Sequence, residues 1–283
     1  MSIKSILNEK KFILSFEVIP PRNKESVPAF ENKIQHLNKM SPDFISVTYG
    51  AAGRSKKGSL KAALYIKKKY GIEVLSHLTC INSTESEIEQ YVNSLIDGGV
   101  NNVLALRGDI ARGINKNQNL KYKYAKDLVK YLSKRQDICI AAATYPEGHS
   151  ESESFEKDIL YLKQKVECGV DFLITQFFFD NGYFYRFREK IEKLGINIPI
   201  IIGIMPVTKV RQLKNMSSLG GASLPNELIK IIDKYGDNEE DFFKAGLEYS
   251  LNQTRDLAKN AVDGVHIYTM NNLTAVDYIV NNL

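Results

Sequence analysis

The chain has 283 residues, of which 43% are hydrophobic and 25% charged, a composition typical of a folded globular protein rather than a disordered one. Its 38 basic and 33 acidic residues leave a net charge of only +5, and the basic residues are spread along the chain, so we expect no nucleic-acid partner. The three cysteines form no CxxC pair and cannot all pair, so we expect a reducing, cytoplasmic location. No apolar run approaches the roughly 20 residues of a membrane span, and residues 1–11 lack the apolar stretch of a signal peptide, so we expect no membrane partner.

A short apolar run, a polar turn and a helix-periodic stretch recur along the chain. The predicted strands are Phe12–Val18, Phe44–Thr48, Glu73–Thr79, Asn102–Leu106, Ile138–Ala143, Asp171–Thr175, Ile198–Ile202 and Val265–Thr269. Successive starts lie 27 to 36 residues apart, except for a last interval of 67. The shorter spacing is what a strand, two loops and a crossover helix need.

Helices are predicted between these strands, and one of them begins at a Thr84-x-x-Glu87 capping box. The long last interval holds further helices, which we place at Thr208–Met216, Pro225–Tyr235 and Glu240–Val262. A final helix, Leu273–Val280, follows the eighth strand.

Eight alternating units predict a parallel sheet covered by helices, and eight is the number of strands that closes a (β/α)8 barrel. The rival fold, a doubly wound open sheet, usually has a glycine-rich first turn. Here that turn is Pro20-Pro21-Arg22, and no GxGxxG occurs. We therefore predict an α/β fold, a (β/α)8 TIM barrel with extra helices between strands 7 and 8, in which residues 1–283 form a single domain.

In such a barrel the active site lies at the carboxyl ends of the strands. Three histidines fall there in the prediction: His77 closes the third strand, His149 lies just beyond the fifth and His266 lies within the eighth. Glu17 interrupts the first strand, where a carboxylate is costly unless it is paired or functional. Its alternative interpretation is an ion pair with Arg22 or another basic neighbour.

Arg107-Gly108-Asp109 follows the fourth strand and places a cation, a residue without Cβ and an anion at the barrel mouth. This set suits a polar cofactor, although the two charges could also form a surface pair. Phe177-Phe178-Phe179 follows the sixth strand and is either core or the wall of a planar ligand. The histidines have no supporting ligand spacing, so no metal is predicted.

Seven ordered motifs between residues 12 and 272 resemble those of the methylenetetrahydrofolate reductase family. They are SFEVIPPR at 15–22, VTYGA at 47–51, HLTC at 77–80, LALRGD at 104–109, YPEGH at 145–149, ITQFFFD at 174–180 and HIYTMN at 266–271. The chain length resembles the bacterial single-domain form of this family. The resemblance implies an FAD-containing barrel that uses NADH or NADPH to reduce 5,10-methylenetetrahydrofolate to 5-methyltetrahydrofolate, in two half-reactions that share one site.

Residue roles carry over by motif. Glu17 matches the family's acid, which protonates the folate N10, and Asp109 matches an aspartate beside the flavin with an electrostatic role. Gln176 matches a residue that hydrogen-bonds the folate, so Glu17 and Gln176 are expected to bind substrate. The residues that fall on family flavin positions are Thr48, Tyr49, Ala51, His77, Arg107, Gly108, Asp109, Tyr124, Ala125, Tyr145, His149, Asp158 and Lys165.

Two residues depart from the family pattern. Asn272 stands where the family usually has an Arg that helps to hold the substrates, and Tyr161 stands where an Asn commonly meets the flavin. We do not expect either position to make its usual contact.

Two other functions are compatible with the residues alone. One is that of another flavin-dependent barrel oxidoreductase, such as a proline-dehydrogenase-like enzyme, and the other is that of a degenerate barrel acting as a binding protein. For the reductase, the expected partners are the nicotinamide cofactor, the folate and further copies of the chain in a homo-oligomer.

Overall fold

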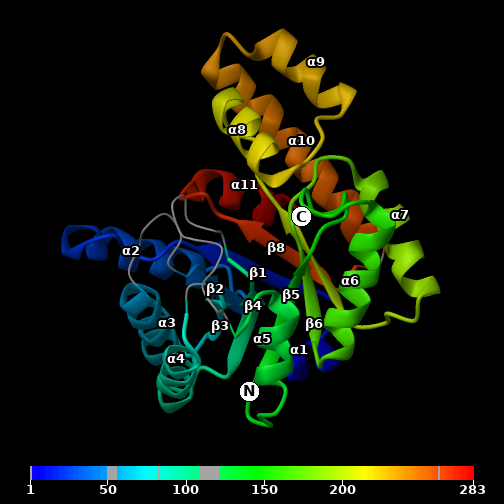
Figure 1. The fold of residues 1–283 in the computed structure, drawn as a ribbon. Coiled ribbons are helices and arrows are strands. Elements are labelled where there is room, and N and C mark those ends of the chain that lie inside the picture. The colour runs from blue at the N-terminus through cyan, green and yellow to red at the C-terminus, as the bar shows by residue number, and fades with distance from the viewer. Residues whose placement is uncertain (1, 50–55, 82, 109–120, 261) are drawn as a thin grey trace, which may run out of the picture.

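The computed structural model of the chain describes residues 2–49, 56–81, 83–108, 121–260 and 262–283. Its centre is a closed barrel of eight parallel strands, in which each strand pairs with the next and β8 pairs back onto β1 (Figure 1). The strands are β1 (Ile13–Val18), β2 (Phe44–Val47), β3 (Glu73–Thr79), β4 (Asn102–Leu106), β5 (Cys139–Thr144), β6 (Phe172–Thr175), β7 (Ile200–Ile204) and β8 (Gly264–Tyr268). The predicted (β/α)8 barrel is confirmed.

Helices surround the barrel and connect its strands (Figure 1). They are α1 (Ile3–Glu9), the 3-10 helix η1 (Lys24–Ser26), α2 (Val27–Asn38), α3 (Lys56–Tyr70), α4 (Glu85–Asp97), α5 (Ala125–Leu132), α6 (Phe155–Glu167), α7 (Asn181–Lys193), α8 (Val210–Gly220), α9 (Asn226–Tyr235), α10 (Glu239–Lys259) and α11 (Leu273–Asn282). As predicted, α8, α9 and α10 fill the interval between β7 and β8. The helices α8 and α9 and the start of α10 project beyond the end of the barrel at which the strands finish, and α10 then runs back to pack against α7, α11 and β8 (Figure 1). In the part of the chain that the structure describes, no helix is both long and apolar enough to cross a membrane.

Several element boundaries differ from the prediction. The strand β7 begins later than predicted, at Ile200, because Pro199 has no N–H to donate to a strand ladder. The N–H of Ile200 instead donates to the carboxylate of Asp263 at 2.8 Å. The helix α10 ends at Lys259 rather than at Val262.

The capping box predicted for α4 is present. The N–H of Glu87 donates to Oγ1 of Thr84 at 3.2 Å, and the N–H of Thr84 donates to the Glu87 carboxylate at 2.8 Å. These two bonds satisfy backbone donors that would otherwise be left free at the start of the helix.

A helix that the sequence analysis does not predict closes the amino-terminal end of the barrel. Ile3 and Ile6 of α1 are buried and belong to the apolar cluster inside the barrel. The N–H of Ile3 donates to Oδ1 of Asn102 at 2.8 Å, which ties α1 to the start of β4. The other members of this cluster are Ile13, Phe44, Leu75, Leu104, Cys139, Ala141, Phe172, Ile174 and Ile201.

The three consecutive phenylalanines after β6 are core residues. Phe178 packs in the large cluster between the barrel and its surrounding helices. Phe177 and Phe179 pack in a separate cluster with residues of α8, α9 and α10. Since all three rings are at most 4% exposed, they leave no ring face for a planar ligand, and Phe177 and Phe179 hold the extra helices against the barrel.

Candidate active site

Segments from successive strands bring predicted site residues to the carboxyl end of the barrel. Glu17 lies one residue before the end of β1, and His77 lies close to the end of β3. The others follow a strand directly: Thr48 follows β2, Arg107 follows β4, Tyr145 follows β5 and Gln176 follows β6. The barrel geometry thus gathers residues that are up to 159 positions apart, from Glu17 to Gln176, at one end.

Glu17 contacts His77 and, among the described residues, has no ion pair with Arg22. Its Oε2 lies 3.6 Å from Nε2 of His77, and only 19% of the Glu17 side chain and 9% of the His77 side chain are exposed. Burial raises the pKa of Glu17 to about 8 and lowers the pKa of His77 to about 3. Both groups are therefore uncharged at neutral pH, so the pair is a carboxylic acid beside a neutral imidazole and not a salt bridge.

His266 lies in the barrel interior, and its ring nitrogens are engaged there. Its Nδ1 lies 2.8 Å from Oγ of Ser15, and its Nε2 lies 3.1 Å from Oγ of Ser46. The ring stacks on Phe44 with a centroid distance of 5.7 Å. Burial lowers the pKa of His266 to about 3, so the ring is neutral. His266 thus links three strands beneath the mouth and offers no free nitrogen to a ligand.

Two of the predicted flavin positions hold buried polar atoms that lack a hydrogen-bond partner among the described residues. These atoms are Oγ1 of Thr48 and Nε2 of His77. An unsatisfied buried donor or acceptor costs about 1–3 kcal/mol, so a bound ligand that supplies the partner is favoured.

Gly108 adds a position where a side chain is excluded. Its φ is +85°, and a Cβ there would lie 2.8 Å from Cβ of Thr79. L-residues other than glycine rarely adopt this conformation, and the neighbouring strand end leaves no room for one. The space in which a side chain would lie is filled by Thr79 and Ile81, so this position after β4 requires glycine.

The predicted cations of the site already have partners. Arg107 forms a two-pronged ion pair with Glu151, in which one N–O distance is 2.9 Å. Lys165 donates from Nζ to the carbonyl oxygen of Ala143 at 2.6 Å. Burial lowers the pKa of Lys165 to about 8, and the nearby charge of Asp158 opposes this shift. A phosphate-bearing ligand would have to compete with Glu151 for Arg107.

Other predicted residues are positioned by local contacts. The rings of Tyr145 and His149 meet edge to face with a centroid distance of 4.7 Å, and Nδ1 of His149 accepts from the N–H of Glu151 at 3.1 Å. Oε1 of Gln176 accepts from the N–H of Phe177 at 3.1 Å, which orients the amide after β6.

Other residues singled out from the family motifs differ from Thr48 and His77, because their side chains are packed against neighbours or exposed to solvent. The ring of Tyr49 is buried against Tyr91 at a centroid distance of 4.9 Å, so only its backbone can meet a ligand. Tyr124 precedes Ala125 at the start of α5, and its side chain is 57% exposed. Tyr161 on α6 is 47% exposed. Ala51 and Asp109 lie outside the described residues.

Tyr268 is a site residue that the sequence analysis misses. Its hydroxyl donates to the carbonyl oxygen of Thr175 at 2.8 Å, and burial raises its pKa. A Cβ on Gly203 would lie 2.7 Å from the Tyr268 ring, so this glycine makes room for the ring. The available signal was the alternation along β8, because Tyr268 lies two residues after His266 and so faces the same side.

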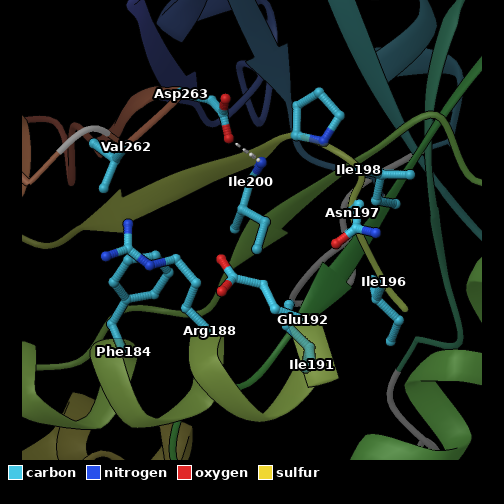
Figure 2. Close-up of a pocket in the computed structure, with 11 residues that line it drawn as sticks. Phe184, Arg188, Ile191, Glu192, Ile196, Asn197, Ile198, Ile200, Val262 and Asp263 are labelled. Carbon is cyan, nitrogen blue, oxygen red and sulfur yellow. Dashed lines mark hydrogen bonds between the residues drawn. The ribbon is translucent and has the colours of Figure 1, made fainter. Parts of the chain in front are cut away.

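A pocket of about 310 Å³ lies at the other end of the barrel (Figure 2). It is bounded by α7 and by the segments that precede β7 and β8, and its polar lining includes Arg188, Glu192, Asn197 and Asp263. Figure 2 shows that the Asp263 carboxylate is directed at the N–H of Ile200, so this group joins two strands. The pocket is separate from the strand ends where the predicted site residues gather.

Comparison with known proteins identifies the family of the chain. The family model described as methylenetetrahydrofolate reductase matches residues 2–283. The chain belongs to the methylenetetrahydrofolate reductase family. This membership supports the resemblance inferred from the motifs and weighs against the two alternative functions.

Curated relatives from bacteria and plants agree with this assignment. The 5,10-methylenetetrahydrofolate reductase of Escherichia coli (strain K12) is 35% identical over 258 residues, which cover 91% of this chain and 86% of the relative. That of Buchnera aphidicola subsp. Baizongia pistaciae is 36% identical over 264 residues, covering 93% and 88%. Methylenetetrahydrofolate reductase (NADH) 1 of Arabidopsis thaliana is 30% identical over 99% of this chain, which spans 50% of that longer protein.

Solved structures support the fold alone, because their sequence identities are low. An uncharacterized protein from Clostridium thermocellum that binds two copies of 5-methyl-5,6,7,8-tetrahydrofolic acid superposes with a TM-score of 0.71 at 14% identity, covering 100% of this chain and 97% of that one. Oxaloacetate acetylhydrolase superposes with a TM-score of 0.56 at 9% identity, covering 97% and 81%.

Proposed function

We propose that the chain is an FAD-dependent enzyme that reduces 5,10-methylenetetrahydrofolate to 5-methyltetrahydrofolate with NADH or NADPH, in two half-reactions at one site. The observation that carries this proposal is Glu17, a carboxyl group that burial keeps protonated at the mouth of the barrel. Membership of the reductase family and the names of the curated relatives support the same reaction. The name of the Arabidopsis relative includes NADH, which favours a nicotinamide reductant.

The residues at the mouth fit a flavin. The unpartnered Oγ1 of Thr48 and Nε2 of His77 can bond to polar groups of the cofactor. Arg107 and Lys165 can neutralise its pyrophosphate. The other residues proposed to hold FAD are Tyr49, Ala51, Asp109, Tyr124, Ala125, Tyr145, His149 and Asp158.

When bound, FAD would supply the hydride-transfer chemistry between the reduced nicotinamide and the folate. The chain's own residues manage the protons and charges of this reaction. Glu17 donates its proton to N10 of the folate as the five-membered ring opens. The imidazole of His77, 3.6 Å away, is neutral and does not take this proton from the carboxyl group.

Two further residues position the substrate in this proposal. Gln176 follows β6 at the mouth, where its side-chain amide can hydrogen-bond the folate. Asp109 would act through its charge, which favours a cationic folate after ring opening and disfavours additional anionic character on the flavin. We also propose that residues 1–283 act as one domain, as a homo-oligomer and in the cytoplasm.

The absorption spectrum of the purified protein tests the proposal. FAD should copurify or be taken up, NADH should bleach its visible absorption under anaerobic conditions, and methylenetetrahydrofolate should then restore it. A colourless protein that takes up no added FAD would contradict the proposal. A flavoprotein that NADH bleaches but that folate does not reoxidise would instead indicate a different oxidoreductase.

A further inference from the structure

The turn after β8 carries two asparagines and is tied to the backbone of β1. Oγ1 of Thr269 donates to the backbone carbonyl oxygen of Glu17 at 2.8 Å, which anchors the start of the turn to β1. Met270 and Asn271 have φ values of +46° and +61°, so the chain reverses sharply here. Oδ1 of Asn272 accepts from the N–H of Ala275 at 3.1 Å and caps α11. The uncharged Asn272 is therefore engaged with its own helix.

A lysine from another helix reaches this turn. The ammonium group of Lys33 on α2 donates to Oδ1 of Asn271. Asn271 lies two positions after Thr269 along the chain, which corresponds to at most about 7 Å of backbone. The structure thus brings a cation from α2 beside the residue where the family usually carries an arginine.

Lys33 contrasts with Lys67 in what it contacts. Lys67, which is 20% exposed, pairs with the Glu73 carboxylate. Among the described residues Lys33 has no carboxylate within ion-pair distance and contacts only a neutral amide. Burial lowers its pKa, because the charged form loses water without gaining a counter-charge. Burying a cation without a counter-charge is costly, so an anionic ligand at Lys33 would supply the missing charge.

We propose that Lys33 binds the glutamate carboxylates of the folate substrate and so replaces the cation that Asn272 does not supply. This inference rests on the proposed function, in which the pterin amine must reach Glu17. The tail of a folate held in that way has to leave the mouth past the surrounding turns. The turn at residues 269–272 is hydrogen-bonded to the backbone of Glu17 through Thr269 and to Lys33 through Asn271. A folate tail that follows this turn away from Glu17 would reach the ammonium group of Lys33.

Equilibrium binding to the FAD-loaded protein tests the inference by calorimetry. The probes are 5-methyltetrahydrofolate and 5-methyltetrahydropteroyl amide, in which an uncharged amide replaces the glutamate. Lys33→Met should weaken binding of the folate by about tenfold or more, since a charge-assisted bond is lost, and should leave binding of the amide unchanged. Lys33→Arg should retain most of the folate affinity.

Two further variants sharpen the test. Lys39→Met, which removes an exposed cation from the end of the same helix, should leave the binding of both probes unchanged. In the Lys33→Met background, Asn272→Arg should restore part of the lost folate affinity, because it returns a cation next to Asn271. If Asn272→Arg recovered none of the lost affinity, that result would count against the idea that cations at positions 33 and 272 bind the same folate carboxylates.

Other results would overturn the inference. Equal weakening of both probes would make Lys33 a residue that only supports the turn, and weakened binding of NADH with unchanged folate binding would assign the cation to the nicotinamide cofactor. Unchanged folate binding in Lys33→Met would remove Lys33 from the site while leaving the proposed function intact. Absence of folate binding in the wild-type protein would overturn the proposed function itself.

Discussion

At the scale of single residues, the site depends on burial that removes charge. Glu17 and His77 are adjacent and of opposite acid–base character, yet desolvation keeps each in its neutral form. An exposed pair of the same residues would exchange a proton and become an ion pair near neutral pH. The barrel mouth instead stores the proton on the carboxyl group, where a general acid needs it.

Glu17→Gln should separate the two proposed half-reactions. The amide has no proton to donate at N10, so folate reduction should fall by about 10²–10⁴, whereas flavin reduction by NADH should stay within about tenfold of wild type. Stopped-flow absorption measures each step. Glu25→Gln, at an exposed carboxyl in η1, is the matched control and should change neither rate. If Glu17→Gln slowed NADH oxidation as much as folate reduction, Glu17 would be a structural or flavin-positioning residue.

At the scale of secondary-structure elements, the two ends of the barrel have different tasks. The amino-terminal end is closed by α1, whose apolar side chains continue the packing inside the barrel. The carboxyl end is extended by α8, α9 and α10, and the N–H of Ser223 between α8 and α9 donates to the Glu147 carboxylate after β5 at 3.0 Å. Stability at one end and ligand contacts at the other can therefore be altered separately.

Ile3→Ala should destabilise the protein without altering the site. Ile3 is fully buried, so its truncation leaves a cavity that costs about 2–5 kcal/mol. Urea unfolding measures this loss, and FAD affinity should stay unchanged because α1 lies at the far end of the barrel. Lys4→Ala is the control: it removes only an ion pair with Asp171 in which the lysine is 59% exposed, and should cost less than about 1 kcal/mol. If the Ile3→Ala protein lost FAD affinity while still fully folded, the two ends of the barrel would be energetically coupled.

At the scale of the whole molecule, the buried neutral groups have opposite effects on stability as the pH changes. His77 and His266 have folded-state pKa values near 3, below the ordinary value of 6.5, so folding releases their protons between these limits and stability rises with pH there. Glu17 has a folded-state pKa near 8, above its ordinary value of 4.5, so folding takes up a proton and stability falls as the pH rises from 4.5 to 8. Between pH 6.5 and 8 only the effect of Glu17 is left among these three groups.

The free energy of unfolding should therefore fall between pH 6.5 and 8, by up to about 1.4 kcal/mol per pH unit. Glu17→Gln should remove most of this slope, because the amide does not titrate. Urea unfolding of both proteins in the same flavin state, at several pH values in this window, measures the difference. Equal slopes in the two proteins would mean that the Glu17 carboxyl is already ionised in the folded protein.

The sequence by itself determined the architecture and most of the candidate site. Spacings near 30 residues and strand-length apolar runs are local properties, and eight such units close one kind of barrel. Motifs at strand ends led to Glu17, His77 and Gln176, because the carboxyl ends of all strands in a parallel barrel lie at the same end of the barrel. The predicted element boundaries were wrong where side-chain contacts decide them, as at the start of β7. The helix α1 was not predicted, because it has too few residues for a clear periodic signal.

Only the tertiary structure decided which side chains face each other and which atoms lack partners. Tyr268 comes to lie beside Glu17 because the register of β8 on β1 pairs these two residues across 251 positions. Lys33 meets Asn271 because α2 packs beside α11, which nothing near either residue in sequence indicates. The protonation of Glu17 likewise depends on how much water the closed barrel excludes. Desolvation and long-range register arise from the assembled fold, and so no local pattern in the chain encodes them.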